Sequence, residues 1–278
     1  MKSQKSQLKR MGVMSKNPLE AHSAATEKAQ APIIGHLVEL RSRLIWVMGA
    51  MIFGTVVCFG FAEQIYSFLV APLAGAMGPE DTGRLIYTGL TEAFFTYIKV
   101  AFFAGIFLTF PVLLIQIWRF VAPGLYKNER SAFLPFIIAT PVLFFLGGAV
   151  VYGVVLPLVV DFFLGYQSTA SETALPIQLE ARVSEYLSLV MTMVFAFGLC
   201  FQLPVLLTLM GKAELITAGA LARKRKYALI VALIAAAFLT PPDIISQIML
   251  GTAIMLLYEL SIILIRFVHK PAVTSSDT

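Results

Sequence analysis

Six apolar runs, separated by short polar segments, constrain this chain more than any other feature of its sequence. They cover residues 44–62, 92–119, 131–164, 185–210, 227–240 and 244–265. A helix needs ~20 mainly apolar residues to cross the core of a lipid bilayer. Every run except the fifth, which has 14 residues, reaches about that length. The sequence therefore predicts an all-α, polytopic membrane protein with six transmembrane helices.

The composition also indicates that lipid, rather than water, is the solvent of this chain. Of its 278 residues, 58% are hydrophobic and only 13% are charged, with a mean hydropathy of +0.83. Soluble domains carry roughly 25% charged residues, and a chain of this size cannot hide so much apolar surface in one water-exposed core. These values exclude a soluble enzyme, a disordered chain and a nucleic-acid-binding domain, so no nucleic acid partner is expected.

The positive charges indicate how the helices are oriented. Eighteen Lys and Arg residues fall in segments 1–43, 119–130 and 211–226 and in the C-terminal tail, whereas the alternate loops hold only Arg84 and Arg182. Because Lys and Arg accumulate in cytoplasmic loops, we expect both termini in the cytosol. Residues 1–31 are polar and are expected to be a disordered cytosolic tail. Residues 32–268 would form the membrane domain, and residues 269–278 a second cytosolic tail.

The expected helices have very different lengths. The second and third runs span about 28 and 34 residues, or ~42 and ~51 Å of helix. Both exceed the ~30 Å core, so these helices must tilt, kink or project into water. The fifth reaches only ~21 Å, and the fifth and sixth are expected to form a short hairpin beside a thinned bilayer. Long bent helices next to a short hairpin predict a concave body. The candidate kink sites are Pro111, Pro135, Pro141 and Pro157.

No catalytic, phosphate-binding or zinc-protease motif occurs in the sequence. Cys58 and Cys200 lie singly in apolar runs and are interpreted as buried hydrophobic side chains. The chain is therefore expected to be a binder or a conduit rather than an enzyme, with no cofactor and no metal.

Acidic residues are scarce on the basic, predicted cytosolic face. Glu39 precedes the first apolar run and Glu129 lies in the loop after the second. Arg43 stands four residues after Glu39, the spacing of a helical ion pair. The two carboxylates either neutralise part of the basic field or form a site for a guanidinium ligand, which carboxylates bind through charge-assisted, bidentate hydrogen bonds.

Three polar side chains are predicted to lie inside the membrane: Lys99, Gln202 and Glu259. Ionisable groups in lipid are costly, so a functional role is one interpretation. The alternatives are snorkelling to the interface for Lys99 and a hydrogen bond to a neighbour for Glu259. Between the last two runs, Asp243 is a candidate N-cap of the sixth helix, and Gln247 shares its face. A solute or ion transporter using such groups is an alternative function, although the sequence shows no internal repeat.

Several segments, taken in order, resemble the twin-arginine protein translocase subunit TatC family. They are residues 36–41, 71–73, 92–99, 120–130, 196–198 and 239–243. The likeness covers roughly residues 33–268. These segments include four prolines to which we assign structural roles: Pro72, Pro123, Pro241 and Pro242.

The resemblance implies a receptor and core subunit that binds Arg-Arg signal peptides and exports folded proteins by the proton-motive force, in the inner (cytoplasmic) membrane. It implies a peptide site at Glu39 and Glu129, beside Arg41 and Phe120. Its implied partners are precursor proteins, TatA-like and TatB-like single-helix subunits, membrane lipid and further copies of the chain. The small subunits would dock on helices five and six, where we expect contacts from Thr240, Asp243, Gln247 and Glu259. Many family members carry Glu where this chain has Gln202, which cannot ionise.

Overall fold

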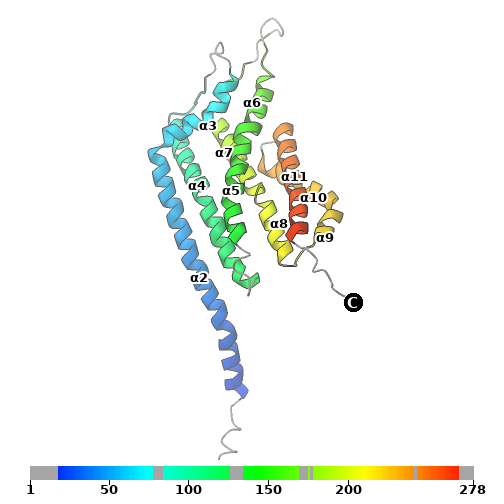
Figure 1. Cartoon of the computed structure of the whole chain (residues 1–278). Coiled ribbons are helices and arrows are strands. Elements are labelled where there is room, and N and C mark those ends of the chain that lie inside the picture. Colours follow the sequence, from blue (N-terminus) through cyan, green and yellow to red (C-terminus); the bar gives the residue numbers. More distant parts are fainter. Residues whose placement is uncertain are drawn as a thin grey trace, which may run out of the picture. The chain divides into compact units, whose positions relative to one another are not determined.

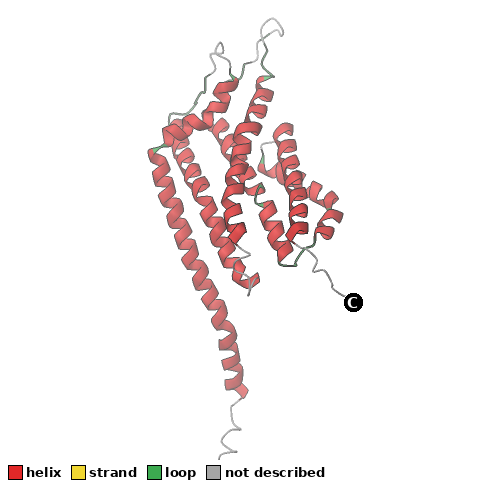
Figure 2. Cartoon of the chain, viewed as in Figure 1, coloured by secondary structure: helices red, strands yellow, loops and turns green. Residues whose placement is uncertain are grey.

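Helices form almost all of the regular structure in the computed structural model of this chain (Figure 1, Figure 2). The structure describes residues 18–77, 84–125, 134–168, 175, 178–240 and 243–268, with side chains from Val38 onward except at 120–125 and 134. No strand forms within these residues, although an isolated bridge joins Ile86 to Arg182. The predicted all-α fold is confirmed.

The chain divides into two compact units, Met1–Met48 and Gly49–Thr278. Helix α2, Pro18–Gly60, begins in the first unit and ends in the second. Residues 18–31, which the sequence assigns to a disordered tail, are therefore helical in this structure. Pro is tolerated in a first helical turn, and the alanines that follow favour helix. Residues 1–17 and 269–278 lie outside the described residues, so the domain limits stay predictions.

The second unit is built around α7 and α11. Helix α7 packs against α4 and α5, and α11 packs against α8 and α10, while α3 lies against α4 and α6. The helices of this unit are α3 (Ala62–Ala76), α4 (Glu92–Leu125), α5 (Leu134–Val150), α6 (Leu156–Leu164), α7 (Val183–Cys200), α8 (Leu203–Lys212), α9 (Ala218–Arg223), α10 (Arg225–Leu239) and α11 (Ile244–Val268).

Five segments of the described chain are long and apolar enough to cross a membrane: Val38–Gly60, Glu92–Arg119, Pro135–Leu164, Val183–Lys212 and Ile244–Val268. The chain is thus a multi-pass membrane protein. The predicted fifth span corresponds to α10, whose 15 residues make ~22 Å of helix. The prediction of a short sixth helix is wrong, because α11 has 25 residues, or ~37 Å. Its apolar pattern continues past Arg266 to Val268. A sixth span, the orientation, the kinks and the concave shape stay predictions.

Two of the long spans are not continuous α-helices. The third contains a π-helical turn, Val151–Val155, just before Pro157, and the amide of Leu156 bonds to the carbonyl of Val151. The predicted unbroken fourth helix is corrected, because it breaks at Phe201–Gln202, between α7 and α8. Pro204 explains this break, since it has no N–H to bond to the carbonyl four residues earlier.

Two short helices lie where the sequence predicts loops, and one predicted loop starts later. Helix α3 occupies about the first half of the outer loop predicted between the first two runs, and α9 lies within the predicted loop 211–226. Helix α4 continues to Leu125, so Phe120 and Pro123 belong to its last turns rather than to the following loop. The residues between Phe120 and Pro123 are apolar and compatible with helix. Pro123 itself removes only one backbone hydrogen bond, so the helix can continue through it.

The structural role predicted for Pro72 has a visible basis in α3. Proline has no N–H, so the carbonyl of Phe68, four residues earlier, lacks its helical donor. The Tyr152 hydroxyl donates to this carbonyl at 2.9 Å, and the two rings stack with centroids 4.2 Å apart. The Tyr186 hydroxyl donates to the next carbonyl, that of Leu69, at 3.1 Å. Two tyrosines from other helices therefore replace backbone hydrogen bonds around Pro72.

Candidate functional site

Glu39, the first acid of the predicted peptide site, carries a guanidinium partner in its own helix. The Nε and Nη2 atoms of Arg43 lie 3.1 and 2.5 Å from Glu39 Oε1. The Glu39 side chain is 47% exposed, which leaves it accessible to solvent. The ion pair predicted from the spacing is confirmed. Arg41 is also exposed, but it lies two residues from Glu39 and so projects from a different face of α2.

The remaining residues of that site are only partly placed. Glu129 lies outside the described residues, as do Pro241 and Pro242. Phe120 and Pro123 are placed on the backbone of α4, with side chains that are not described. The meeting of Glu39 and Glu129 therefore stays a prediction.

Gln202 lies at the break between α7 and α8 and is buried. Its Nε2 donates to the carbonyl of Thr140 in α5 at 3.1 Å, so the side chain fastens the broken helix to its neighbour. Its Oε1 is buried without a hydrogen-bond partner among the described residues. A neutral amide meets this environment better than a carboxylate, because an unpaired charge would cost far more there.

Four other buried hydroxyls are satisfied within their own helices, whereas that of Thr208 in α8 has no partner among the described residues. Those of Thr96, Thr140, Thr240 and Ser261 donate to the carbonyl four residues earlier, at 2.6–2.9 Å. Such local bonds satisfy polar groups where lipid offers no partner. The Thr240 hydroxyl, predicted to contact a partner helix, is thus buried and already bonded within its own chain.

Glu259 is paired rather than isolated. The Nε and Nη2 atoms of Arg225, the first residue of α10, lie 2.6 and 2.7 Å from its two carboxylate oxygens. This bidentate pair joins α10 to α11, and the hydrogen bond to the Glu259 carboxylate raises the pKa of Arg225. The Tyr258 hydroxyl also donates to the carbonyl of Leu221 in α9, at 2.9 Å. This pairing was not predicted, because Arg225 falls in a segment that the sequence predicts to be a loop.

The start of α11 has the predicted cap. Asp243 Oδ1 accepts from the Ser246 amide at 2.7 Å, and its Oδ2 accepts from the Ser246 hydroxyl. The capping role of Asp243 is therefore confirmed. Gln247 is half-buried, and its amide makes no side-chain hydrogen bond within the described part of the chain. Among the predicted docking residues, Gln247 is thus the one whose polar group is not engaged.

A polar cluster where α4 and α7 begin was not predicted. We call Glu92, Thr88, Arg182 and Ser184 the Glu92 cluster. Ser184 Oγ donates to Glu92 Oε1 at 2.6 Å, and the Thr88 amide donates to Oε2 at 2.9 Å. Arg182 Nη2 lies 3.6 Å from the same oxygen and donates to Thr88 Oγ1 at 2.6 Å. The sequence offered one signal for this cluster, because Arg182 is one of only two Lys or Arg residues in the predicted outer loops.

The polar side chains considered for a small-solute transporter do not meet one another among the described residues. Lys99, Gln202 and Glu259 make no hydrogen bond or ion pair with one another in the described part of the chain. Nor do three or more His, Cys, Asp or Glu side chains there lie close enough to hold a metal ion. What the described polar groups do is fasten helices and, at Glu39, bind a guanidinium.

Comparison with known proteins gives one consistent family. A family profile described as Sec-independent protein translocase protein (TatC) matches residues 35–252. The chain is 52% identical over 241 residues to a Sec-independent protein translocase protein TatC of Magnetococcus marinus, covering 87% of this chain and 86% of the relative. A protein of that name from Escherichia coli is 36% identical over 236 residues, covering 85% of this chain and 88% of the relative.

A solved structure has the same fold. The crystal structure titled twin arginine translocase receptor TatC superimposes with a TM-score of 0.73 at 36% identity. The match covers 84% of this chain and all of the solved one.

Proposed function

Because the chain belongs to the TatC family and is thus a component of a Sec-independent protein translocase, we propose that it is the subunit that recognises cargo. In this proposal it binds the Arg-Arg signal peptide of a precursor on the cytosolic face. It then takes part in exporting the folded protein across the inner membrane, driven by the proton-motive force. Several copies and two kinds of single-helix subunit, TatA-like and TatB-like, form the working complex.

The observation that carries the peptide-binding role is the Glu39–Arg43 contact. It supports the proposal because two guanidinium nitrogens of Arg43 converge on one carboxylate oxygen of the exposed Glu39 side chain. Hydrogen bonds between charged groups are short and roughly twice as strong as neutral ones. A peptide guanidinium can replace the guanidinium of Arg43, since the two have the same shape and charge. Arg43 would then act as an internal competitor that the peptide displaces.

Glu129 supplies the second carboxylate in this proposal. Eighteen of the 21 Lys and Arg residues fall on the predicted cytosolic side, which supports the orientation with both termini in the cytosol. The acids on this face are surrounded by Lys and Arg side chains, which compete with the peptide for them. Two acids acting together would therefore favour a ligand that carries two adjacent cations. Arg41 and Phe120 would flank the peptide.

Helices α10 and α11 are the proposed docking surface for the single-helix subunits. Helix α10 exposes large apolar side chains on most of its surface, including Tyr227, Val231 and Phe238. In lipid, helices associate through packing and interhelical hydrogen bonds rather than through hydrophobicity, and the Gln247 amide offers such a bond. A cysteine at Gln247 should cross-link to a small subunit, whereas one at Phe53, exposed on α2, should not. Equal cross-linking from both would remove this assignment.

Peptide binding to the full chain in lipid nanodiscs tests the recognition site. Glu39→Gln and Glu129→Gln should each weaken binding of an Arg-Arg peptide by ~10–100-fold, because each charged hydrogen bond contributes ~1.5–3 kcal/mol and 1.4 kcal/mol is tenfold. A Lys-Lys peptide should bind more weakly, since Lys has no bidentate fork. Glu214→Gln, at an exposed acid on the same predicted face, is the matched control and should have no effect.

The Arg43→Gln variant separates the proposed competition from a purely structural role. If Arg43 occupies the peptide's position, its removal should strengthen peptide binding. Normal binding by both Glu39→Gln and Glu129→Gln in correctly inserted protein would show that the recognition role assigned to these acids is wrong.

A further inference from the structure

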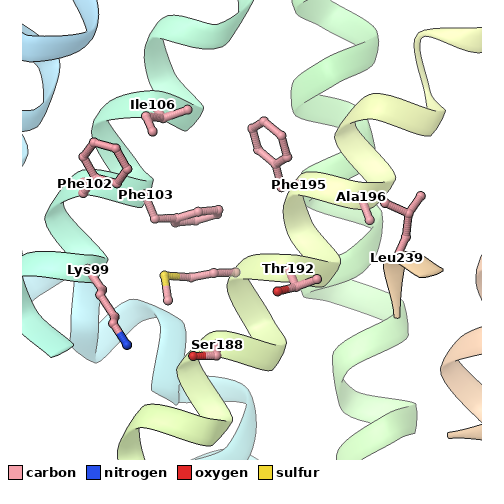
Figure 3. Close-up of a pocket in the computed structure, with 10 residues that line it drawn as sticks. Lys99, Phe102, Phe103, Ile106, Ser188, Thr192, Phe195, Ala196 and Leu239 are labelled. Carbon is pink, nitrogen blue, oxygen red and sulfur yellow. The ribbon is translucent and has the colours of Figure 1, made fainter. Parts of the chain in front are cut away.

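A groove of about 450 Å³ lies between α4 and α7 and extends to the end of α10. Its volume falls in the ~300–1,000 Å³ range of ligand-binding pockets. Its wall is mostly apolar, with Phe102, Phe103 and Ile106 from α4 facing Phe195 from α7 (Figure 3). The groove therefore offers a hydrocarbon surface at the depth of the bilayer core.

The polar groups of the groove gather toward one end. Figure 3 shows the Lys99 amine and the Ser188 hydroxyl at that end, Thr192 further along, and Ile106 and Phe195 toward the other end. Ser188 Oγ donates to the carbonyl of Ser184 at 2.6 Å and keeps its lone pairs. The Thr192 hydroxyl has no hydrogen bond within the described part of the chain, so it remains available as a donor.

Lys99 is the one charge of this groove. It lies seven residues after Glu92, which places its Cα ~10 Å along α4 from the end of the helix. None of the ion pairs found among the described residues involves Lys99. Glu92 and Glu185, the acids nearest that end of α4 and α7 in sequence, are paired with Arg182. An ammonium in lipid is costly unless it reaches an anion or the interface.

We propose that this groove binds one anionic phospholipid from the leaflet at the Glu92 end of the bundle. The lipid phosphate accepts hydrogen bonds from the Lys99 ammonium and the Thr192 hydroxyl. One acyl chain lies along the groove against Phe103 and Phe195. In the orientation proposed above, this is the outer leaflet.

Charge and depth favour a lipid over a protein helix as the occupant. An amine about two turns from the helix end lies within reach of the phosphates that anionic phospholipids carry at the interface. A partner helix would have to bring its own carboxylate to the same depth. The groove also has the polarity of a lipid, with charge at one end and phenylalanine rings at the other.

Photolabelling of the full chain in vesicles tests the proposal. A phosphatidylglycerol with a diazirine in its acyl chain should label residues 99–106 and 188–196 at low mole fraction. The matching phosphatidylcholine probe should label them about tenfold less. Lys99→Gln should remove that difference, and Lys99→Arg should keep it. Lys226→Gln, which removes an exposed lysine at the far end of α10, is the matched control and should leave it unchanged.

Four results would contradict the proposal. The first is equal labelling by the two probes in the unmodified protein, and the second is an unchanged preference in Lys99→Gln. The third comes from the assembled complex: photoreactive residues at Phe103 and Phe195 that capture a single-helix subunit and no lipid would assign the groove to a protein helix. Displacement of the anionic probe by glycerol phosphate alone would contradict the acyl-chain contact.

Discussion

Helix α7 buries ten of its 18 residues, whereas α10, which is similarly short and apolar, buries two of its 15. The two buried residues of α10 are alanines, Ala232 and Ala236, and the helix packs mainly against α11. Helix α7 instead packs large side chains such as Leu187, Met193 and Phe197. Apolar character therefore does not decide which helix of a membrane protein forms the core. In lipid an exposed apolar face is stable, so the surface of α10 can contact either lipid or a partner helix.

The largest expected loss of stability comes from truncating the buried side chain of Phe197. Its side chain is 1% exposed, so Phe197→Ala should lower the free energy of unfolding by ~3–5 kcal/mol. Phe238→Ala on α10, at a side chain that is 87% exposed, should change it by less than ~0.5 kcal/mol. Equilibrium unfolding in bicelles measures both. Similar losses would mean that α10 is packed as tightly as α7.

Glycine-to-alanine substitutions compare how closely the helix backbones approach at the α5–α7 interface and at the α10–α11 interface. A Cβ on Gly147 would meet the Phe197 carbonyl at 2.8 Å and the Gly198 Cα at 3.0 Å, so α5 and α7 would have to separate. Gly147→Ala should cost ~1–3 kcal/mol of unfolding free energy. A Cβ on Gly251 meets only the end of the Leu233 side chain, at 3.2 Å, which can move. Gly251→Ala should be neutral or stabilising by up to ~1 kcal/mol, and a loss as large as that of Gly147→Ala would contradict the comparison.

The hydroxyls of the two tyrosines around Pro72 should contribute less to the free energy of unfolding than these packing positions do. Removing the buried hydroxyl in Tyr186→Phe should cost ~1 kcal/mol, and Tyr152→Phe, at a more exposed site, should cost less. Pro72→Ala restores an N–H that can bond to the carbonyl of Phe68. In that background Tyr152→Phe should therefore lose most of its effect, which a double-mutant cycle would detect. Additive losses would mean that Tyr152 acts only through packing.

The smallest effect is expected at the Arg225–Glu259 pair. Both side chains are partly exposed at the end of α10 that the predicted orientation places near the cytosol, where water and salt screen their attraction. Glu259→Gln should change the stability only slightly, and the change should vanish at high ionic strength. A large loss that persists in salt would show that the pair is shielded and holds α10 in place.

The spans and the local motifs could be predicted because they depend on neighbouring residues. Run length predicted the five long spans. The spacing of Glu39 and Arg43 predicted an ion pair, and the position of Asp243 just before the last run predicted a cap. The break before α8 was also visible in principle, since Pro204 lies two residues after Gln202 in an otherwise apolar run. It was missed because hydropathy alone treats that run as one helix.

The remaining features depend on contacts between distant residues. Glu259 meets Arg225 34 positions away, and Ser184 reaches Glu92 across 92 positions. Helix α3 was missed because its polar residues and Pro72 resemble a loop, and tyrosines from other helices satisfy its carbonyls. The small number of buried residues on α10 could not be predicted either, because it follows from which helices flank it.

Transport into inverted membrane vesicles tests most directly whether this chain is the cargo-recognising subunit of its translocase. Vesicles containing the chain and its single-helix partners should import a folded precursor with an Arg-Arg signal. Import should fall at least tenfold with a Lys-Lys signal or with Glu39→Gln, and it should stop when a protonophore collapses the proton gradient. Import that is indifferent to the signal and to Glu39 would contradict the recognition role. Import that continues without the gradient would contradict the proposed energy source.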